Sequence, residues 1–185
     1  MSLPALLRAA LFLGVLLLPG CARAAEIEGL ETRIEEDQLY LSFRLSGAFD
    51  DRLLARVQSG LPTELRYRIE LLRDRKRWFD AALDEETLTV VAMYDALRRE
   101  YLVNAKLDGK LLESRTVHEL AKLEEAMTRI ESLAAFTLPQ KAENPRLLVR
   151  VRAEMGTRQI LGFIPSTLTT DWVESAKFRA RRPPS

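Results

Sequence analysis

The densest group of charged side chains lies between Arg73 and Arg77, which together carry a net charge of +3 and are followed by Trp78. Guanidinium groups next to an indole ring can hold a carboxylate, a phosphate or an acidic protein surface. The alternative is a solvated strand end in which Trp78 packs into the core. We predict a binding role, without catalysis, for this basic cluster, which consists of Arg73, Arg75, Lys76, Arg77 and Trp78.

Two further candidates have weaker support. A general base needs a nucleophile and an orienting acid within hydrogen-bond reach, and the sequence places neither beside His118. We therefore interpret His118 as an exposed residue at the start of a helix. The acidic run Asp84-Glu85-Glu86 is interpreted as a solvated turn, because it lacks the ligand spacing of a calcium loop.

For the remaining candidate residues we expect a structural role and not a catalytic or metal-binding one. Tyr94 and Tyr101 lie on alternating segments, and we expect them in the core. The chain has one cysteine, Cys21, and one histidine, which excludes thiolate catalysis and the common zinc sites from the region beyond the N-terminus. The sequence therefore predicts no catalytic residue, no metal site and no cofactor.

Alternation of apolar and polar residues at period two is the strongest structural pattern, and it is typical of strands with one buried face. The predicted inward residues are Leu39, Leu41, Phe43 and Leu45; Leu65, Tyr67, Ile69 and Leu71; Leu88, Val90, Ala92 and Tyr94; Tyr101, Val103, Ala105 and Leu107; and Leu147, Val149, Val151, Ala153 and Met155. Asp108-Gly109 predicts a tight hairpin turn with residues 111–115 as the returning strand, because both turn positions tolerate a positive φ.

The alternation from Leu65 makes the odd-numbered residues the buried ones. Continued further, it would bury Arg73, Arg75 and Arg77, and an unpaired buried charge costs several kcal/mol. The buried face must therefore end near Leu72, or the strand must bulge or run past the edge of the sheet.

Two segments have helical patterns. Residues 49–59 place Phe49, Leu53, Leu54 and Val57 on one face, and Gly60 follows as a stop. Thr116 and Glu119 form a capping box that opens a second helix, whose expected apolar stripe is Leu120, Leu123, Met127, Ile130 and Ala134. We predict a mainly β, antiparallel β-sandwich-like domain with two amphipathic helices on its surface, for which α+β is the alternative label.

The N-terminal residues 1–24 have the pattern of a signal peptide. The apolar stretch 9–18 is much shorter than the roughly 20 residues that span a bilayer, and Ala22-Arg23-Ala24 is a cleavage site of the A-x-A kind. We expect cleavage between Ala24 and Ala25, a single domain over residues 25–180 and a disordered tail over 181–185. A lipoprotein anchored at Cys21 and an uncleaved N-terminal anchor are the alternatives.

Removal of residues 1–24 takes Arg8 and Arg23 from 28 basic residues and leaves all 27 acidic ones, for a net charge of −1. Such a balance argues against binding to nucleic acid. The expected location is the periplasm or another exported site of the Gram-negative cell envelope.

Several short motifs in a fixed order resemble one known family. They are Gly60-Leu61-Pro62, Arg77-Trp78-Phe79-Asp80, Tyr94-Asp95-Ala96-Leu97, Glu100-Tyr101-Leu102-Val103, the acidic helical segment 119–130, and Asp171-Trp172 with Phe178. Over residues 26–180 the chain resembles DUF4390, a family of exported bacterial proteins of unknown function with no established catalytic residues. The resemblance implies an envelope or membrane protein, such as a sensor kinase, as a partner.

The expected function is therefore a non-enzymatic protein- or ligand-binding domain of the envelope. One alternative is a hydrolytic or other enzyme whose site assembles from dispersed Asp, Glu, Tyr and Arg residues, which convergent carboxylates with perturbed pKa values would favour. The other is a lipid-binding envelope-assembly module, which an apolar cavity would favour.

Overall fold

The computed structural model describes residues 24–75, 81–138, 145–160 and 164–179. Residues 1–23 of the predicted leader 1–24, most of the basic cluster (Lys76, Arg77 and Trp78) and the tail 181–185 lie outside the described residues.

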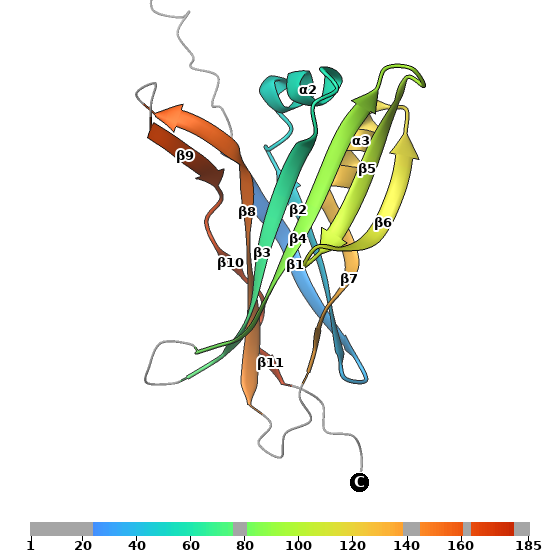
Figure 1. The fold of residues 1–185 in the computed structure, drawn as a ribbon. Coiled ribbons are helices and arrows are strands. Elements are labelled where there is room, and N and C mark those ends of the chain that lie inside the picture. The colour runs from blue at the N-terminus through green and yellow to red at the C-terminus, as the bar shows by residue number, and fades with distance from the viewer. Residues whose placement is uncertain (1–23, 76–80, 139–144, 161–163, 180–185) are drawn as a thin grey trace, which may run out of the picture.

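A small antiparallel sheet in the order β1-β2-β7 forms one layer (Figure 1). Its strands are β1 (Glu26–Glu35), β2 (Gln38–Ser46) and β7 (Arg129–Thr137). A larger antiparallel sheet forms the other layer in the order β10-β8-β3-β4-β5-β6, and β9 and β11 also pair with β8. Its strands are β3 (Thr63–Arg73), β4 (Ala81–Asp95), β5 (Glu100–Leu107), β6 (Lys110–Val117), β8 (Arg146–Ile160), β9 (Ile164–Thr169), β10 (Val173–Glu174) and β11 (Phe178–Arg179).

The two sheets bury a shared core, and Tyr67 lies at its centre. Its ring meets the ring of Phe43 from the small sheet edge-on, with 5.3 Å between centroids. The Tyr67 hydroxyl donates a hydrogen bond of 2.8 Å to the carbonyl oxygen of Met127 in α3 (Leu120–Thr128). The predicted mainly β antiparallel fold with two helices is thus confirmed over the described residues.

The period-two pattern identifies the buried faces correctly. Leu39, Leu41, Leu65, Ile69 and the other predicted inward residues are mostly buried in β2, β3, β4, β5 and β8, with Tyr94, Ala105, Leu107 and Met155 half-buried. The predicted hairpin also forms, since Asp108 and Gly109 have φ values of 46° and 80° between β5 and β6.

The inward face of β3 ends where the charge argument requires. The pairing of β3 with β4 shifts register between Leu71 and Leu72, where Leu83 of β4 is the extra residue, and β3 ends at Arg73. Leu71 and Leu72 are both buried. Arg73 is half-buried and Arg75 is exposed.

The first predicted helix is confirmed as α2 (Asp51–Gln58), although only Val57 of its apolar face is fully buried. The Asp50 side chain caps its first turn by accepting a hydrogen bond from the backbone N–H of Leu53 at 2.8 Å. Gly60 follows the helix with a φ of 78°, in the left-handed region that glycine adopts without strain.

The prediction for the second helix is wrong at both ends. Thr116 does not cap it, because Thr116 pairs with Leu102 inside β6, and α3 starts at Leu120 without a side-chain cap. The helix ends at Thr128, and Ile130 and Ala134 of the expected stripe belong to β7. Nor is α3 only a surface helix, because it contacts β2 and β7 of the small sheet and β4 and β5 of the large one.

Candidate functional site

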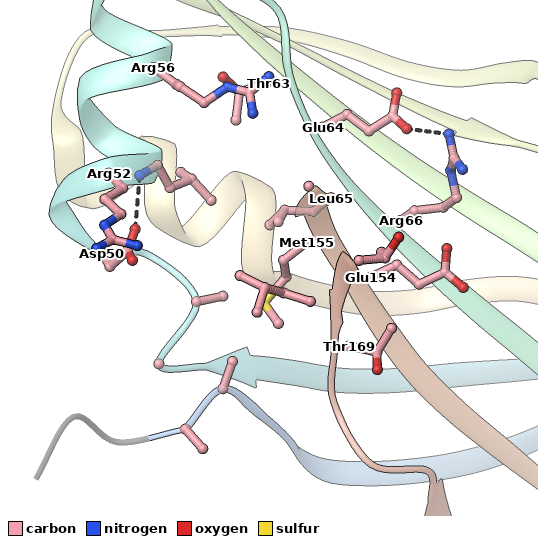
Figure 2. Close-up of a pocket in the computed structure, with 18 of the residues that line it drawn as sticks. Asp50, Arg52, Arg56, Thr63, Glu64, Leu65, Arg66, Glu154, Met155 and Thr169 are labelled. Atoms are coloured by element: carbon pink, nitrogen blue, oxygen red, sulfur yellow. Dashed lines mark hydrogen bonds and ion pairs between the residues drawn. The ribbon is translucent and has the colours of Figure 1, made fainter. Parts of the chain in front are cut away.

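A cleft of about 800 Å³ opens at the end of the fold that carries α2, and we call it the α2 cleft (Figure 2). The start of the described chain, the segment from β2 into α2, the beginning of β3 and the β8–β9 pair all contribute to it. Its volume is within the range of small-molecule binding sites.

Apolar side chains form the floor of the α2 cleft. Leu65 of β3 and Met155 of β8 are paired across adjacent strands, and Leu53 of α2, Ala48 and Leu168 of β9 are among the other apolar lining residues. Leu65 is fully buried, whereas Leu53 and Met155 keep part of their surface exposed. Such a floor can hold a hydrocarbon group by removing it from water.

Each carboxylate that lines the α2 cleft already has a partner. Asp50 caps α2, and Glu64 forms an ion pair with Arg66 that Figure 2 shows as a dashed line. Glu154 lies 3.5 Å from Arg152, which is outside the cleft lining.

The two arginines of α2, unlike Glu64 and Glu154, have no ion-pair partner among the described residues. Arg52 and Arg56 lie one helical turn apart and both line the cleft. Gly156 has a φ of 57°, and a Cβ atom there would lie 3.7 Å from Nη1 of Arg56. The cleft thus combines an apolar floor with two guanidinium groups that remain available to an anion.

The described residues of the basic cluster, Arg73 and Arg75, do not line this cleft. Thr63, at the start of β3, lines the cleft, whereas Arg73 ends the same strand. Beyond Arg73, Asp74 forms ion pairs with Lys177 at 3.0 Å and with Arg146 at 3.7 Å. The described part of the cluster is therefore a separate basic end of the large sheet.

The acidic run is a strand and not the predicted turn. Asp84, Glu85 and Glu86 lie in β4, and their side chains alternate between its two faces. Glu85 pairs with Arg68 on the outer face, opposite to Glu86.

Glu86 instead lies on the inward face of the large sheet. Partial burial, together with the charges of Asp108 and Asp84, raises the pKa of Glu86 to about 7. Its Oε2 atom is buried without a hydrogen-bond partner among the described residues. Because Glu86 does not line the α2 cleft, the carboxyl group with the raised pKa and the cleft are separate features. No group of metal-ligating side chains occurs in the described chain.

The other sequence candidates are structural. His118 is exposed between β6 and α3, as expected. Tyr94 and Tyr101 are paired across β4 and β5 with ring centroids 4.9 Å apart, and Tyr101 is buried.

The sequence did not indicate the role of Trp172. Its ring lies over the guanidinium groups of Arg150 and Arg152, at 4.5 Å and 4.7 Å, on the outer face of the large sheet. Arg152 in turn contacts Glu154, which lines the α2 cleft. Trp172 therefore holds the arginine that engages one of the cleft carboxylates.

The fold defines a mainly β domain with a cleft at one end and no described helix long and apolar enough to cross a membrane. Residues 22–172 match the family described as Domain of unknown function (DUF4390), and the chain belongs to this family. Phe178 and the segment after Trp172 lie outside the matched residues. Neither a search of curated proteins nor a search of solved structures found a match.

Proposed function

We propose that this chain is an exported, non-enzymatic binding domain of the cell envelope, and that the α2 cleft holds a ligand with an apolar body and an anionic head group. The signal-peptide pattern of residues 1–24 supports export. The observation that carries the choice of ligand is the pair Arg52 and Arg56 above the floor formed by Leu53, Leu65 and Met155.

Electrostatics favours an anion in this cleft over a cation. The three cleft carboxylates are engaged by the helix start, by Arg66 and by Arg152, so little negative charge remains for a cation. Two neighbouring guanidinium groups offer several donors in a planar arrangement that matches a carboxylate or phosphate. An amphiphile satisfies both halves of the cleft at once.

Ligand binding also fits the cleft better than catalysis does. Acid–base catalysis by a carboxyl group requires that this group has a suitably shifted pKa and reaches the bound molecule. Glu86 is the described carboxyl group with a raised pKa, and it does not line the cleft. The proposed role thus combines the ligand-binding and lipid-binding interpretations of the sequence.

Calorimetry with residues 25–185 tests the proposal. The ligands are dodecanoate, dodecyl phosphate and the uncharged dodecyl maltoside, each below its micelle concentration. We expect the two anions to bind, and Arg52→Ala/Arg56→Ala to weaken them about ten- to a hundredfold, as the loss of one or two charge-assisted hydrogen bonds implies.

The matched control is Arg33→Ala/Arg98→Ala, which removes two arginines that do not line the cleft. It should leave binding of the anions unchanged. If dodecyl maltoside bound as tightly as the two anions, the cleft would not select an anionic head group. The same conclusion would follow if both double variants lost the same affinity for the anions.

The basic end of the large sheet supports a second candidate role, which is to dock an acidic protein surface. Arg146 and Lys177 pair there with Asp74, whose neighbours in the sequence are Arg73 and Arg75. The resemblance to DUF4390 suggests a membrane protein such as a sensor kinase as the partner. Recovery of one envelope protein at low salt by wild type, and its loss with Arg73→Ala/Arg75→Ala/Arg77→Ala in a folded protein, would support this role.

A further inference from the structure

The large sheet has two very different edges. On one side, β9, β10 and β11 pair with successive parts of β8 and cover its edge. On the other side, β6 pairs with β5 alone among the described strands, and Figure 1 shows it as the outermost strand. An uncovered edge presents backbone N–H and C=O groups that can pair with another strand.

The side chains of β6 are exposed along nearly the whole strand, with Val117 half-buried. Leu111 and Leu112 keep 60% and 50% of their surface exposed. The pairing of β6 with β5 shifts register between Ala105 and Lys106, which leaves Leu112 as the extra residue of a bulge. Regular pairing geometry therefore covers residues 113–117.

Only certain registers allow two copies of β6 to pair antiparallel around a twofold axis. Directly opposite residues in such a pair point to the same face of the sheet, so the axis must pass through a residue position. An axis at Glu113 opposes two glutamates, and an axis at Arg115 opposes two arginines. Like charges directly opposite each other are destabilising.

An axis at Ser114 instead places opposite charges next to each other. It places Glu113 of each copy opposite Arg115 of the other, which gives two complementary pairs. The internal contact between Glu113 and Arg115 shows that these side chains already lie on one face of the strand.

We propose that the β6 edge is a self-association surface, on which a second copy of this chain pairs antiparallel with its twofold axis at Ser114. The covered edge at β8 and the self-complementary charges of β6 support a second copy over an unrelated strand. The regular stretch is short, so the interface is smaller than a standard one, and we expect a dissociation constant of about 10 µM.

Cysteine crosslinking tests the register directly, because residues 25–185 contain no cysteine. Opposite residues in an antiparallel pair have Cα atoms about 4.5–5.5 Å apart, within the range of a disulfide. Ser114→Cys should form a covalent dimer under mild oxidation. Glu113→Cys and Arg115→Cys should crosslink when mixed, because the two new cysteines are then opposite each other, and not when each is oxidised alone. Arg98→Cys, in an exposed turn, is the background control.

Charge reversal provides an independent readout by sedimentation equilibrium. Glu113→Arg or Arg115→Glu alone should abolish the dimer, and the double variant should restore it, because exchange of both charges recreates the complementary pairs. The proposal would be overturned if Ser114→Cys gave no more covalent dimer than Arg98→Cys. It would also be overturned if the wild-type protein stayed monomeric at about 100 µM, which is about tenfold above the expected dissociation constant. Because β6 does not contribute to the α2 cleft, ligand binding by the monomer would be unaffected by that outcome.

Discussion

The hydroxyl group of Tyr67 in β3 donates a hydrogen bond to the carbonyl oxygen of Met127 near the end of α3, although 60 residues separate them in the sequence. Both residues are fully buried. Desolvation raises the pKa of Tyr67 above its usual value, so the phenol remains a donor across the ordinary pH range. This bond connects the large sheet to α3.

Tyr67→Phe should therefore destabilise the domain by about 1–2 kcal/mol, because the Met127 carbonyl oxygen is left buried without a donor. Urea unfolding followed by circular dichroism measures this change. Tyr40→Phe, in a half-buried side chain stacked under Arg33, is the matched control and should cost much less. Equal losses for the two variants would show that the Tyr67 hydrogen bond contributes nothing specific.

The two faces of β3 should respond very differently to the same new charge. Ile69 is fully buried and Arg68 is partly exposed on the opposite face. Ile69→Asp should unfold the domain, since an unpaired buried carboxylate costs several kcal/mol. Arg68→Asp removes a surface ion pair with Glu85 and should cost about 1 kcal/mol or less. Similar melting temperatures for both variants would contradict the register of β3.

Glu86 should make stability depend on pH. Its pKa is 4.5 in an ordinary setting and about 7 in the fold, so the folded state binds the proton more tightly than the unfolded state does. Stability should therefore fall as pH rises from about 4.5 to 7, and the loss should be complete above pH 7. Glu86→Gln should recover about 1–2 kcal/mol above pH 7, less than the full linkage value because solvent reaches this side chain.

Glu85→Gln is the control for this titration, because Glu85 lies on the outer face of the same strand. Urea unfolding at a series of pH values should show the two variants diverging only as pH rises. If the unfolding free energy of Glu86→Gln followed the wild-type pH dependence throughout, Glu86 would not be the group that destabilises the fold at high pH.

Export should leave a mature protein that begins at Ala25, and N-terminal sequencing of protein from the envelope fraction tests this expectation. Ala24 and Ala25 line the α2 cleft, and Ala25 packs against the core. Cleavage is therefore expected before the domain folds. A mature start at Cys21 with the mass of acyl chains would replace this expectation with a lipoprotein.

The sequence predicted strands wherever one apolar face continued without interruption, and it failed where bulges changed the spacing. In β1 the register shifts between Glu28 and Glu31, so the inward residues change from Ile27 to Thr32 and Ile34. Gly29, with a φ of 62°, allows this bulge.

A similar effect explains the error in the second helix. Two register shifts between β2 and β7 place Ile130, Leu133 and Phe136 opposite Phe43, Leu41 and Leu39. Their spacing of three residues imitates the period of a helix, and pairing with β2 overrides that local pattern.

The α2 cleft could not be predicted because its residues come from separate stretches of the chain. Arg52 and Arg56 are ordinary helix-surface residues until the fold brings Leu65, Met155 and Gly156 beside them. By contrast, the basic cluster is conspicuous because its charges are adjacent in sequence, and its described residues Arg73 and Arg75 do not line the cleft.

The most direct test of the proposed function is to locate the bound ligand by two-dimensional NMR. Dodecanoate should be titrated into ¹⁵N-labelled residues 25–185, with the dimer surface disabled by Glu113→Arg. We expect the largest shifts at Leu53, Leu65 and Gly156, and their loss in the Arg52→Ala/Arg56→Ala protein. Shifts confined to the basic end around Asp74, or no saturable shifts at all, would contradict the α2 cleft as the binding site.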